Sequence, residues 1–506
     1  MIHLRYHISF LIIYECYERV IRQMSLYHPD GLYVWDTWYL NMEGEIHVFY
    51  LQMKRSSSTR DLPENASLGH AVSKDLHNWE ELPTSILPGK KGTYDDGHIF
   101  TGCALEHDGS IYLYYTSNHS EKGQRTQGIC LAISEDGIHF TKHQSNPIIE
   151  PDPEIYISKS TDPVSFHYHN WPTVDCRDIV IIPSPTSDGW LGYVVMRLKE
   201  AGMQNSCCVA LCDSKDLIHW KVNGPCCMPR RFTCFEVPDV FKLNDKWYMI
   251  ALTADSYGQR ARFSDPNCRH ATIVFESNSP RGLFEEVRDN LLLASKDHQG
   301  FSARTVEYEG KRLMFYTRPE GGWPTGGSNW GQISWPVELV TNPGGGLLPR
   351  FWNGNERAFE NPISLDEIQM EAKNGWTLRT LPLPSEQPDE FMLKIRVKFD
   401  ACAVGISFHR KEDRTFGSGK LLLWDRDRSE LELCMLPDFR TSQCRRFKME
   451  DDKFDLRLIV LDNMIEAYMN DELLLNEFWP SCTGRPLQIF CENGKANFRN
   501  IKFFQR

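Results

Sequence analysis

A strand pattern that recurs five times constrains the fold of this chain more than any other feature. Short runs rich in aromatic and β-branched residues occur in the first two thirds of the sequence: "EIHVFY" (45–50), "SIYLYYT" (110–116), "GWLGYVVM" (189–196), "DKWYMIAL" (245–252) and "KRLMFYT" (311–317). Their starts lie about 55 to 80 residues apart, which is the spacing of four-stranded propeller blades that carry loops. The sequence therefore predicts an all-β protein that begins with a five-bladed β-propeller.

A second repeat supports this architecture. Three segments share a Ser-x-Asp pattern that ends in an aromatic residue: "SKDLHNW" from Ser73, "SEDGIHF" from Ser134 and "SKDLIHW" from Ser214. Each is expected to form the same β-turn between outer strands of a blade. Trp79 and Trp220, which end two of the segments, are expected to pack between blades.

Five positions in the chain are predicted to be structurally equivalent. Each recurring strand follows another strand pattern and a turn, so each pair should form a hairpin. Because the first strand of a blade usually lines the central channel, the start of each hairpin should face one funnel. These positions lie near Asp36, Thr101, Asp178, Glu236 and Ser302. Three of them carry carboxylates, which raise one another's proton affinity when they converge, so the cluster is costly unless it is used.

Three converging carboxylates suit the hydrolysis of a glycosidic bond with retention. The reaction needs one ionised carboxylate to attack the anomeric carbon and, about 5 Å away, a protonated carboxyl to donate to the leaving oxygen. Asp36 lies between two tryptophans, and apolar neighbours favour a protonated Glu236 near neutral pH. Arg177 should keep the adjacent Asp178 ionised, a state suited to accepting hydrogen bonds from sugar hydroxyls.

The ordered motifs "WDTWY", "CRDI" and "FEVPD" resemble those of glycoside hydrolase family 32, the group of invertases, inulinases and levanases that shares a clan with the levansucrases. The segments "LGHAVSKDLHNWEELPTSILP" (68–88) and "IFTGCAL" are also similar to the family, and the resemblance covers about residues 25–506. It implies a five-bladed propeller followed by a β-sandwich, and retaining cleavage of β-D-fructofuranosides. By motif, it implies Asp36 as the nucleophile, Asp178 as the transition-state stabiliser and Glu236 as the acid/base.

The motifs also depart from the family pattern. The first motif normally reads Asn-Asp-Pro-Asn-Gly, whereas Trp35 precedes the aspartate here and Thr37 follows it. Further family positions are replaced by Leu51, Leu68, Ile179 and Val237. Hydrolysis is therefore better supported than the identity of the sugar. Substrate contacts are predicted for a mixed set of aromatic and polar residues: Trp35, Trp38, Gln52, Phe100, Thr101, Arg177 and Trp323.

A run rich in glycine and proline, "TNPGGGLLPRF" (341–351), breaks the periodicity after the fifth unit and indicates a domain junction. Alternating runs beyond it, such as "EFMLKIRVKF", predict the strands of a β-sandwich. The predicted organisation is an N-terminal extension at 1–24, the propeller at 25–340, a linker at 341–355 and the sandwich at 356–506. The extension matches a secretory leader poorly, because a small-residue cleavage site is not evident.

Charge and cysteine usage narrow the class of partner. A net charge of -12 and a pI near 5.8 disfavour a nucleic-acid binder, and the sequence has no run of about 18 apolar residues that would predict a membrane span. The expected partner is a small-molecule or oligosaccharide substrate. The 16 cysteines are scattered without a CxxC pair, which favours buried reduced thiols in a cytoplasmic protein over a zinc site or disulfide framework; secretion is the alternative. No cofactor is expected, and the sequence does not determine the oligomeric state.

The leading hypothesis is a retaining glycosidase that releases terminal furanosyl units, above all from β-D-fructofuranosides such as sucrose, fructo-oligosaccharides or fructan. Within the enzymes, the alternatives are a fructosyltransferase and a furanosidase for another sugar, such as arabinofuranose. A carbohydrate-binding propeller without turnover is the alternative from another class. All three carboxylates are kept, which argues against it because binding alone would tolerate amides. A metal site built from the carboxylates is the weakest reading.

Overall fold

The computed structural model describes residues 21–22, 26–54, 66–119, 125–159, 166–168, 171–201, 206–230, 232, 235–254, 270–295, 300–319, 331–383, 390–412, 415–449, 451–461, 464–478 and 486–506. The extension predicted at 1–24 lies outside these residues except for the short strand β1 (Ile21–Arg22). Within the described part of the chain, no helix is long and apolar enough to cross a membrane.

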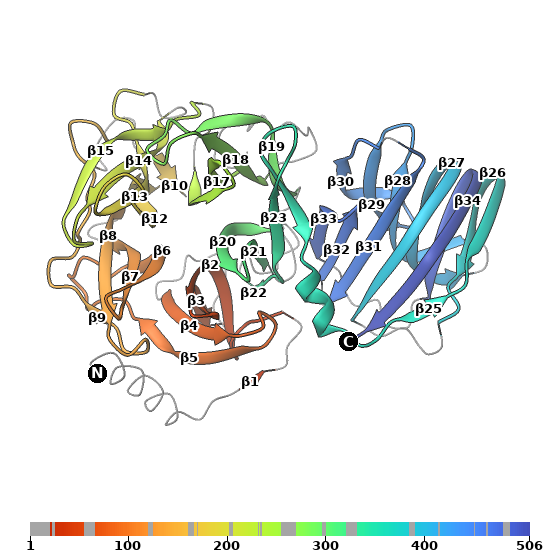
Figure 1. Cartoon of the computed structure of the whole chain (residues 1–506), viewed down its shortest axis with the longest axis horizontal. Helices are drawn as coiled ribbons and strands as arrows, with labels where there is room; N and C mark the ends of the chain where they lie inside the picture. The colour runs from red at the N-terminus through yellow and green to blue at the C-terminus, as the bar shows by residue number, and fades with distance from the viewer. Residues whose placement is uncertain are drawn as a thin grey trace.

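Five blades, built mainly from antiparallel strands, form the propeller (Figure 1). Blade 1 comprises β2 (Leu32–Met42), β3 (Glu45–Lys54), β4 (Ser67–Ser73) and β5 (Trp79–Ile86), with β1 at its outer edge. Blade 2 comprises β6 (His98–His107), β7 (Ser110–His119), β8 (Arg125–Ser134) and β9 (Thr141–Lys142), and its sheet is extended by β10 (Phe166–Tyr168) and β11 (Trp171–Val174). Blade 3 comprises β12 (Cys176–Pro183), β13 (Trp190–Arg197), β14 (Cys207–Ser214) and β15 (Trp220–Cys227).

Blades 4 and 5 complete the ring. Blade 4 comprises β16 (Glu236–Leu243), β17 (Lys246–Ala254), β18 (His270–Ser277) and β19 (Glu285–Ser295). Blade 5 comprises β20 (Phe301–Tyr308), β21 (Lys311–Pro319), β22 (Gly331–Ile333), β23 (Val337–Thr341) and β24 (Leu347–Phe351). The first strands lie next to one another: β2 contacts β6 and β20, β12 contacts β6 and β16, and β16 contacts β20. β22 pairs with β2, with Val34 opposite Gly331, so backbone pairing joins the last blade to the first. The five-bladed propeller predicted from the repeat is confirmed.

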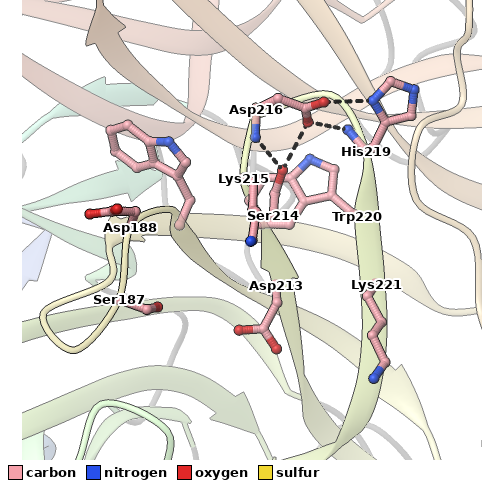
Figure 2. Close-up of a pocket in the computed structure, with 10 residues that line it drawn as sticks. Ser187, Asp188, Asp213, Ser214, Lys215, Asp216, His219, Trp220 and Lys221 are labelled. Carbon is pink, nitrogen blue, oxygen red and sulfur yellow. Dashed lines mark hydrogen bonds and ion pairs between the residues drawn. The ribbon is translucent and has the colours of Figure 1, made fainter.

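The Ser-x-Asp repeat forms one kind of turn in three blades. In blade 3, the Ser214 hydroxyl accepts hydrogen bonds from the backbone amides of Asp216 and Leu217, and Asp216 Oδ1 accepts from those of Ile218 and His219. Figure 2 shows the bonds that the amides of Asp216 and His219 donate in this turn. Asp75 in blade 1 and Asp136 in blade 2 each accept two backbone amides in the same way. The shared side chain-to-backbone bonds explain why these residue types recur at this spacing.

The tryptophans that end two of these repeats pack between blades, as the sequence predicts. Trp79 of blade 1 is 3% exposed and meets Phe315 of blade 5 edge-on. Trp220 of blade 3 meets Tyr114 of blade 2 edge-on, with ring centroids 6.2 Å apart. Each indole therefore contributes to the contact between neighbouring sheets.

The C-terminal part is a β-sandwich. Its strands are β25 (Ile363–Leu365), β26 (Ile368–Thr380), β27 (Phe391–Glu412), β28 (Thr415–Asp425), β29 (Glu430–Leu436), β30 (Arg440–Arg446), β31 (Lys453–Leu461), β32 (Met464–Met469), β33 (Glu472–Phe478) and β34 (Leu487–Gln505). The long strand β27 pairs with β31 along 391–398 and with β28 along 403–412. Its core-facing residues are odd-numbered up to Ala401 and even-numbered from Val404 onward, so the alternation of the strand shifts by one residue there.

The propeller and the sandwich share a hydrophobic core. One continuous cluster of buried side chains draws on blade 4, blade 5 and the sandwich: Tyr248, Tyr316, Trp335, Met392, Ile459 and Leu473 are among its members. The segment 341–355, which the sequence predicts as a linker, contains β24 and the start of a 3-10 helix (Asn353–Ala358). β24 also pairs with the sandwich strand β33, with Arg350 opposite Glu472. The junction is therefore an ordered part of both units.

The 12 cysteines that the structure describes are free thiols, and most of them are buried. Burial raises the pKa of Cys207 to about 11 and that of Cys226 to about 12. Because the thiolate is the reactive form, these buried thiols are protonated and unreactive at neutral pH.

The shared core predicts that the two units unfold together. Ile459→Ala removes a fully buried side chain from this core and should lower the free energy of unfolding by about 2–5 kcal/mol. Denaturant unfolding followed by tryptophan fluorescence and by far-UV circular dichroism should then show one transition, displaced equally for both signals. The control is Leu283→Ala, since Leu283 is 58% exposed and should change stability by about 0.5 kcal/mol or less. Two separate transitions, only one of them displaced, would contradict the prediction.

Candidate active site

Each inner strand of the propeller carries a β-bulge at a corresponding place. The pairing register between the first and second strands shifts after Val34, Phe100, Arg177, Glu236 and Phe301. A bulge takes residues out of the ladder and redirects their side chains. The positions that the sequence predicts to be equivalent lie in or directly beside these bulges: Asp36, Thr101, Asp178, Glu236 and Ser302. Asp178 and Ser302 adopt positive φ angles of 58° and 52°, a sparsely populated conformation that is concentrated at functional sites.

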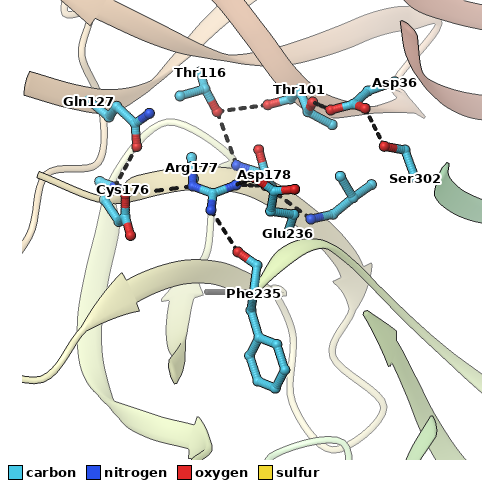
Figure 3. A network of polar contacts seen from close by, with 12 residues as sticks. Asp36, Thr101, Thr116, Gln127, Cys176, Arg177, Asp178, Phe235, Glu236 and Ser302 are labelled. Carbon is cyan, nitrogen blue, oxygen red and sulfur yellow. Dashed lines mark hydrogen bonds and ion pairs between the residues drawn. The ribbon is translucent and has the colours of Figure 1, made fainter. Parts of the chain in front are cut away.

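The carboxylate of Asp36 is held from two sides. Its side chain is buried, Thr101 of blade 2 donates a hydrogen bond to Oδ2, and Ser302 of blade 5 donates to Oδ1 (Figure 3). Hydrogen bonds from hydroxyls to a carboxylate fix its orientation and stabilise its ionised form. Both donors come from the blades that flank blade 1. The sequence marks Ser302 only as an equivalent position, because nothing in its local motif signals a contact with a carboxylate 266 positions away.

The carboxylate of Asp178 is tied to the strand that carries Glu236. Arg177 Nη1 donates to Asp178 Oδ2 at 2.6 Å, and the backbone amide of Val237 donates to the same oxygen at 2.9 Å. Arg177 Nη2 donates to the carbonyl of Phe235 at 2.7 Å, and Nη1 lies 3.5 Å from Glu236 Oε1 (Figure 3). The guanidinium therefore binds protein groups from two blades, which makes Arg177 a positioning residue.

A second buried ion pair supports this arginine. Asp175 Oδ1 lies 3.7 Å from Arg177 Nε, and Asp175 Oδ2 lies 2.6 Å from Arg197 Nε. Arg197 is fully buried and lies on the second strand of blade 3. Buried charges are tolerated only when they are paired. Asp175 lies between the two arginines and pairs with both, which meets this requirement and holds the guanidinium of Arg177 in place.

The three carboxylates influence one another electrostatically. Burial is the main cause that raises the pKa of Asp36 to about 7, and the negative charge of Asp178 raises it further. The hydroxyls of Ser302 and Thr101 lower it in part, while the charge of Glu236 raises it. Asp36 is consequently shared between its protonated and ionised forms near neutral pH, and the anionic form predominates above it.

Two of the residues predicted to contact sugar make contacts within the protein. Trp38 is 2% exposed and stacks on Phe49 in the core cluster between blades 1 and 2, with ring centroids 6.5 Å apart. The side-chain nitrogen of Gln52 donates to the hydroxyl of Ser67 at 3.2 Å and to that of Thr84 at 2.9 Å, within the outer strands of blade 1. Packing and internal hydrogen bonds engage these side chains, and contacts of the two residues with sugar stay predictions.

The other predicted contacts are placed differently. Trp35 and Phe100 are partly exposed beside the bulges, and Phe100 stacks on His98 with ring centroids 5.8 Å apart. Both stay predicted sugar contacts. Thr101 binds Asp36, so its hydroxyl orients the carboxylate. Trp323 lies outside the described residues. Among the residues that the structure does describe, no group of three or more His, Cys, Asp or Glu side chains is arranged to hold a metal ion.

The class of protein is defined by a propeller that carries three carboxylates at the bulges of its inner strands and packs on a β-sandwich. The family model for the glycosyl hydrolases family 32 N-terminal domain matches residues 28–276. Residues 28–276, about half of the chain, are thereby assigned to glycoside hydrolase family 32.

Individual relatives support this assignment. A probable sucrose-6-phosphate hydrolase from Psychromonas ingrahamii is 30% identical over 227 residues, which is 44% of this chain and 36% of that protein. The sucrose-6-phosphate hydrolase of Escherichia coli is 23% identical over 502 residues, which is 94% of this chain and 91% of that protein. The matches to the first curated relatives span less than half of their length. Among solved structures, the exo-inulinase from Aspergillus awamori superposes with a TM-score of 0.71 at 16% identity, covering 96% of this chain and 97% of that one.

The raised pKa of Asp36 makes the stability of the protein depend on pH. The pKa of about 7 in the folded protein exceeds the ordinary value of 3.8 for an aspartate, so the stability that protonated Asp36 contributes is lost as pH rises through 7. Asp36→Asn removes this ionisation, and the hydroxyls beside it can turn to satisfy the amide. The stability gained by the variant should therefore be larger at pH 8 than at pH 5, by about 2 kcal/mol, in urea unfolding at both pH values.

Asp213→Asn is the control. The hydrogen bonds that Arg281 donates to Asp213 are the main cause that lowers the pKa of its carboxyl below the ordinary value, and they outweigh the effect of partial burial. Asp213 is thus ionised at both pH values and its arginine partner keeps its charge, so the substitution should change stability equally at each. A stability gain of Asp36→Asn that is the same at pH 5 and pH 8 would show that Asp36 titrates normally.

Proposed function

We propose that the protein is a retaining β-fructofuranosidase that releases terminal fructosyl units from sucrose, fructo-oligosaccharides or fructan. The observation that carries this proposal is the arrangement of Asp36, a buried carboxylate with a hydroxyl on each oxygen, within reach of the charges of Asp178 and Glu236. Two carboxyl groups with different environments are what retaining hydrolysis requires. Family membership supports the same reaction.

The proposed reaction proceeds in two displacements. Ionised Asp36 attacks the anomeric carbon while Glu236 gives its proton to the leaving oxygen, so that a fructosyl ester forms and the aglycone departs as an alcohol. Glu236, now ionised, takes a proton from water, whose oxygen attacks the anomeric carbon and releases Asp36. The side chain of Glu236 is 22% exposed, which leaves it accessible to the leaving group and to water. Asp178 accepts hydrogen bonds from fructosyl hydroxyls and is fixed for this role by Arg177.

The range of substrates is the finer part of the proposal. The names of the relatives add sucrose 6-phosphate to the candidates. The altered segment around Asp36, with Trp35 before it and Thr37 after it, favours a second candidate function, the release of another furanosyl sugar such as arabinose. A fructosyltransferase would share the first displacement and differ in the acceptor of the second.

Sugar release from a panel of substrates tests the proposal. The panel contains sucrose, sucrose 6-phosphate, inulin and levan oligosaccharides, and an aryl arabinofuranoside. Wild-type protein should release fructose, and Glu236→Gln should lower the rate by about 10²–10⁴-fold, since it removes general acid catalysis. Glu309→Gln, in an exposed turn between strands of blade 5, is the matched control and should keep the wild-type rate. Arabinose as the only released sugar would replace the proposed substrate.

Binding and turnover can be separated with Asp36→Asn. This variant should release no sugar but should keep its affinity for a fructoside in calorimetry, because the amide preserves the shape of the side chain. Equal binding by wild type and variant, with no turnover by either on any substrate in the panel, would identify a carbohydrate-binding propeller.

The pH dependence of the rate tests the role of Ser302. Its hydroxyl lowers the pKa of Asp36, so Ser302→Ala should raise that pKa and displace the acid limb of the pH–rate profile to higher pH. Ser85→Ala is the matched control: Ser85 is 7% exposed, and its hydroxyl has no hydrogen-bond partner among the described residues. An unchanged acid limb in Ser302→Ala would show that this limb does not report the ionisation of Asp36.

A further inference from the structure

A single buried hydroxyl joins the bulge of blade 2 to the bulge of blade 3. Thr101 and Asp178 both fall outside the paired register of their strands, because the ladders shift after Phe100 and after Arg177. Backbone groups that leave a ladder in a buried place need another partner, since an unpaired buried group costs about 1–3 kcal/mol. The side chain of Thr116 supplies this partner for both residues.

Thr116 lies on β7, opposite Phe100 in the register, and is fully buried. Its Oγ1 donates to the carbonyl oxygen of Thr101 at 2.7 Å and accepts a hydrogen bond from the backbone amide of Asp178 at 3.0 Å (Figure 3). A hydroxyl has one proton to donate, and here that proton and an acceptor lone pair are both in use. The hydroxyl therefore links the inner strand of blade 2 to that of blade 3.

Each residue bound by Thr116 holds a part of the reacting site. Thr101 donates its own hydroxyl to Asp36, and Asp178 carries the carboxylate whose charge raises the pKa of Asp36. Asp178 also has a positive φ of 58°, a strained conformation that persists only where its surroundings fix it. Thr116 is thus one hydrogen bond away from the backbone of both segments.

The blade fold does not itself require this hydroxyl. The residue opposite the last paired position before the bulge is Gln52 in blade 1, Val195 in blade 3, Leu252 in blade 4 and Thr317 in blade 5. Blades 3 and 4 form their bulges with an apolar side chain at this place. A hydroxyl is therefore not needed for a bulge as such, and the contact observed for Thr116 is the link between Thr101 and Asp178.

We propose that Thr116 is a positioning residue of the active site, whose hydroxyl sets the placement of Asp178 relative to Asp36 by tying the backbones of Thr101 and Asp178 together. The inference rests on the proposed function, in which Asp36 attacks the fructosyl unit that Asp178 binds. Thr116 touches no substrate in this account and acts through the two backbone groups.

Three substitutions of Thr116 test the inference. Thr116→Val keeps the shape and removes both hydrogen bonds, Thr116→Ser keeps the hydroxyl, and Thr116→Cys offers only a weak thiol donor. The kcat of Thr116→Val for fructose release should fall by about 10–100-fold with a smaller change in KM, because a small misplacement of reacting groups reduces the rate of the chemical step. Thr116→Ser should restore most of the rate, and Thr116→Cys should fall between them. The order of the serine and cysteine variants decides the question even if the valine variant does not fold.

Thr272→Val is the matched control. Thr272 lies in blade 4, is 1% exposed, and its hydroxyl has no hydrogen-bond partner among the described residues. The substitution is thus the same in chemistry and burial, without a hydrogen bond to remove. Its kcat should equal that of the wild type. A loss of kcat in Thr272→Val as large as in Thr116→Val would overturn the inference, because it would show a general effect of the substitution.

Hydrogen–deuterium exchange separates this inference from the proposed function. Peptides that cover 176–180 should exchange faster in Thr116→Val than in the wild type, and at the wild-type rate in Thr116→Ser. This result supports the link even if no substrate of the panel is hydrolysed, in which case the proposed function alone fails. Wild-type exchange and kcat in Thr116→Val, or equal losses in the serine and valine variants, would overturn the role of the hydroxyl.

Discussion

The buried carboxylate of Asp36 sets the constraint on which the rest of the site depends. A charge removed from water is destabilising unless hydrogen bonds compensate for it, and burial accordingly raises the pKa of Asp36 to about 7. The compensating hydroxyls come from Thr101 in the second blade and Ser302 in the fifth. The ring must therefore be closed before the site is complete, and the pairing of Val34 with Gly331 provides that closure.

A β-bulge in the inner strand of every blade brings different side chains to the centre of the propeller. A regular ladder would consume the backbone groups of the inner strands and alternate their side chains between two faces. The bulges interrupt this pattern at corresponding places, and each redirects a different residue. Asp36, Thr101, Asp178, Glu236 and Ser302 thus reach one region from five sheets. Hydroxyls and an arginine form hydrogen bonds with the backbone groups and carboxylates at these bulges. The contacts that position the carboxylates therefore overlap with those that pair the backbone groups left out of the ladders.

The sequence predicts the blades well because each blade repeats a local pattern, and the hairpin positions then identify the three carboxylates. Contacts between blades leave no such pattern: the serine and threonine hydroxyls that bind Asp36 and Asp178 lie 266 and 62 positions from their partners. The packing of Trp38 in the core could not be predicted from strand alternation either. Strand alternation places Trp38 on the same face as Asp36, but Asp36 lies inside the bulge between Val34 and Thr37, so the alternation does not carry across it.

The sandwich packs against the part of blade 5 that contacts Asp36. Gly300 has a positive φ of 80°, and a side chain at this position would meet Asn476 Nδ2 of the sandwich at 2.6 Å. This glycine precedes Ser302 by two residues, on the segment that delivers a hydroxyl to Asp36. On the next strand of blade 5, Tyr316 donates a hydrogen bond to the buried Glu466 of the sandwich, which also accepts one from Tyr468. The segment of blade 5 that delivers the hydroxyl of Ser302 to Asp36 is therefore packed against the sandwich. The interface between the two units thus helps to position the residues around Asp36.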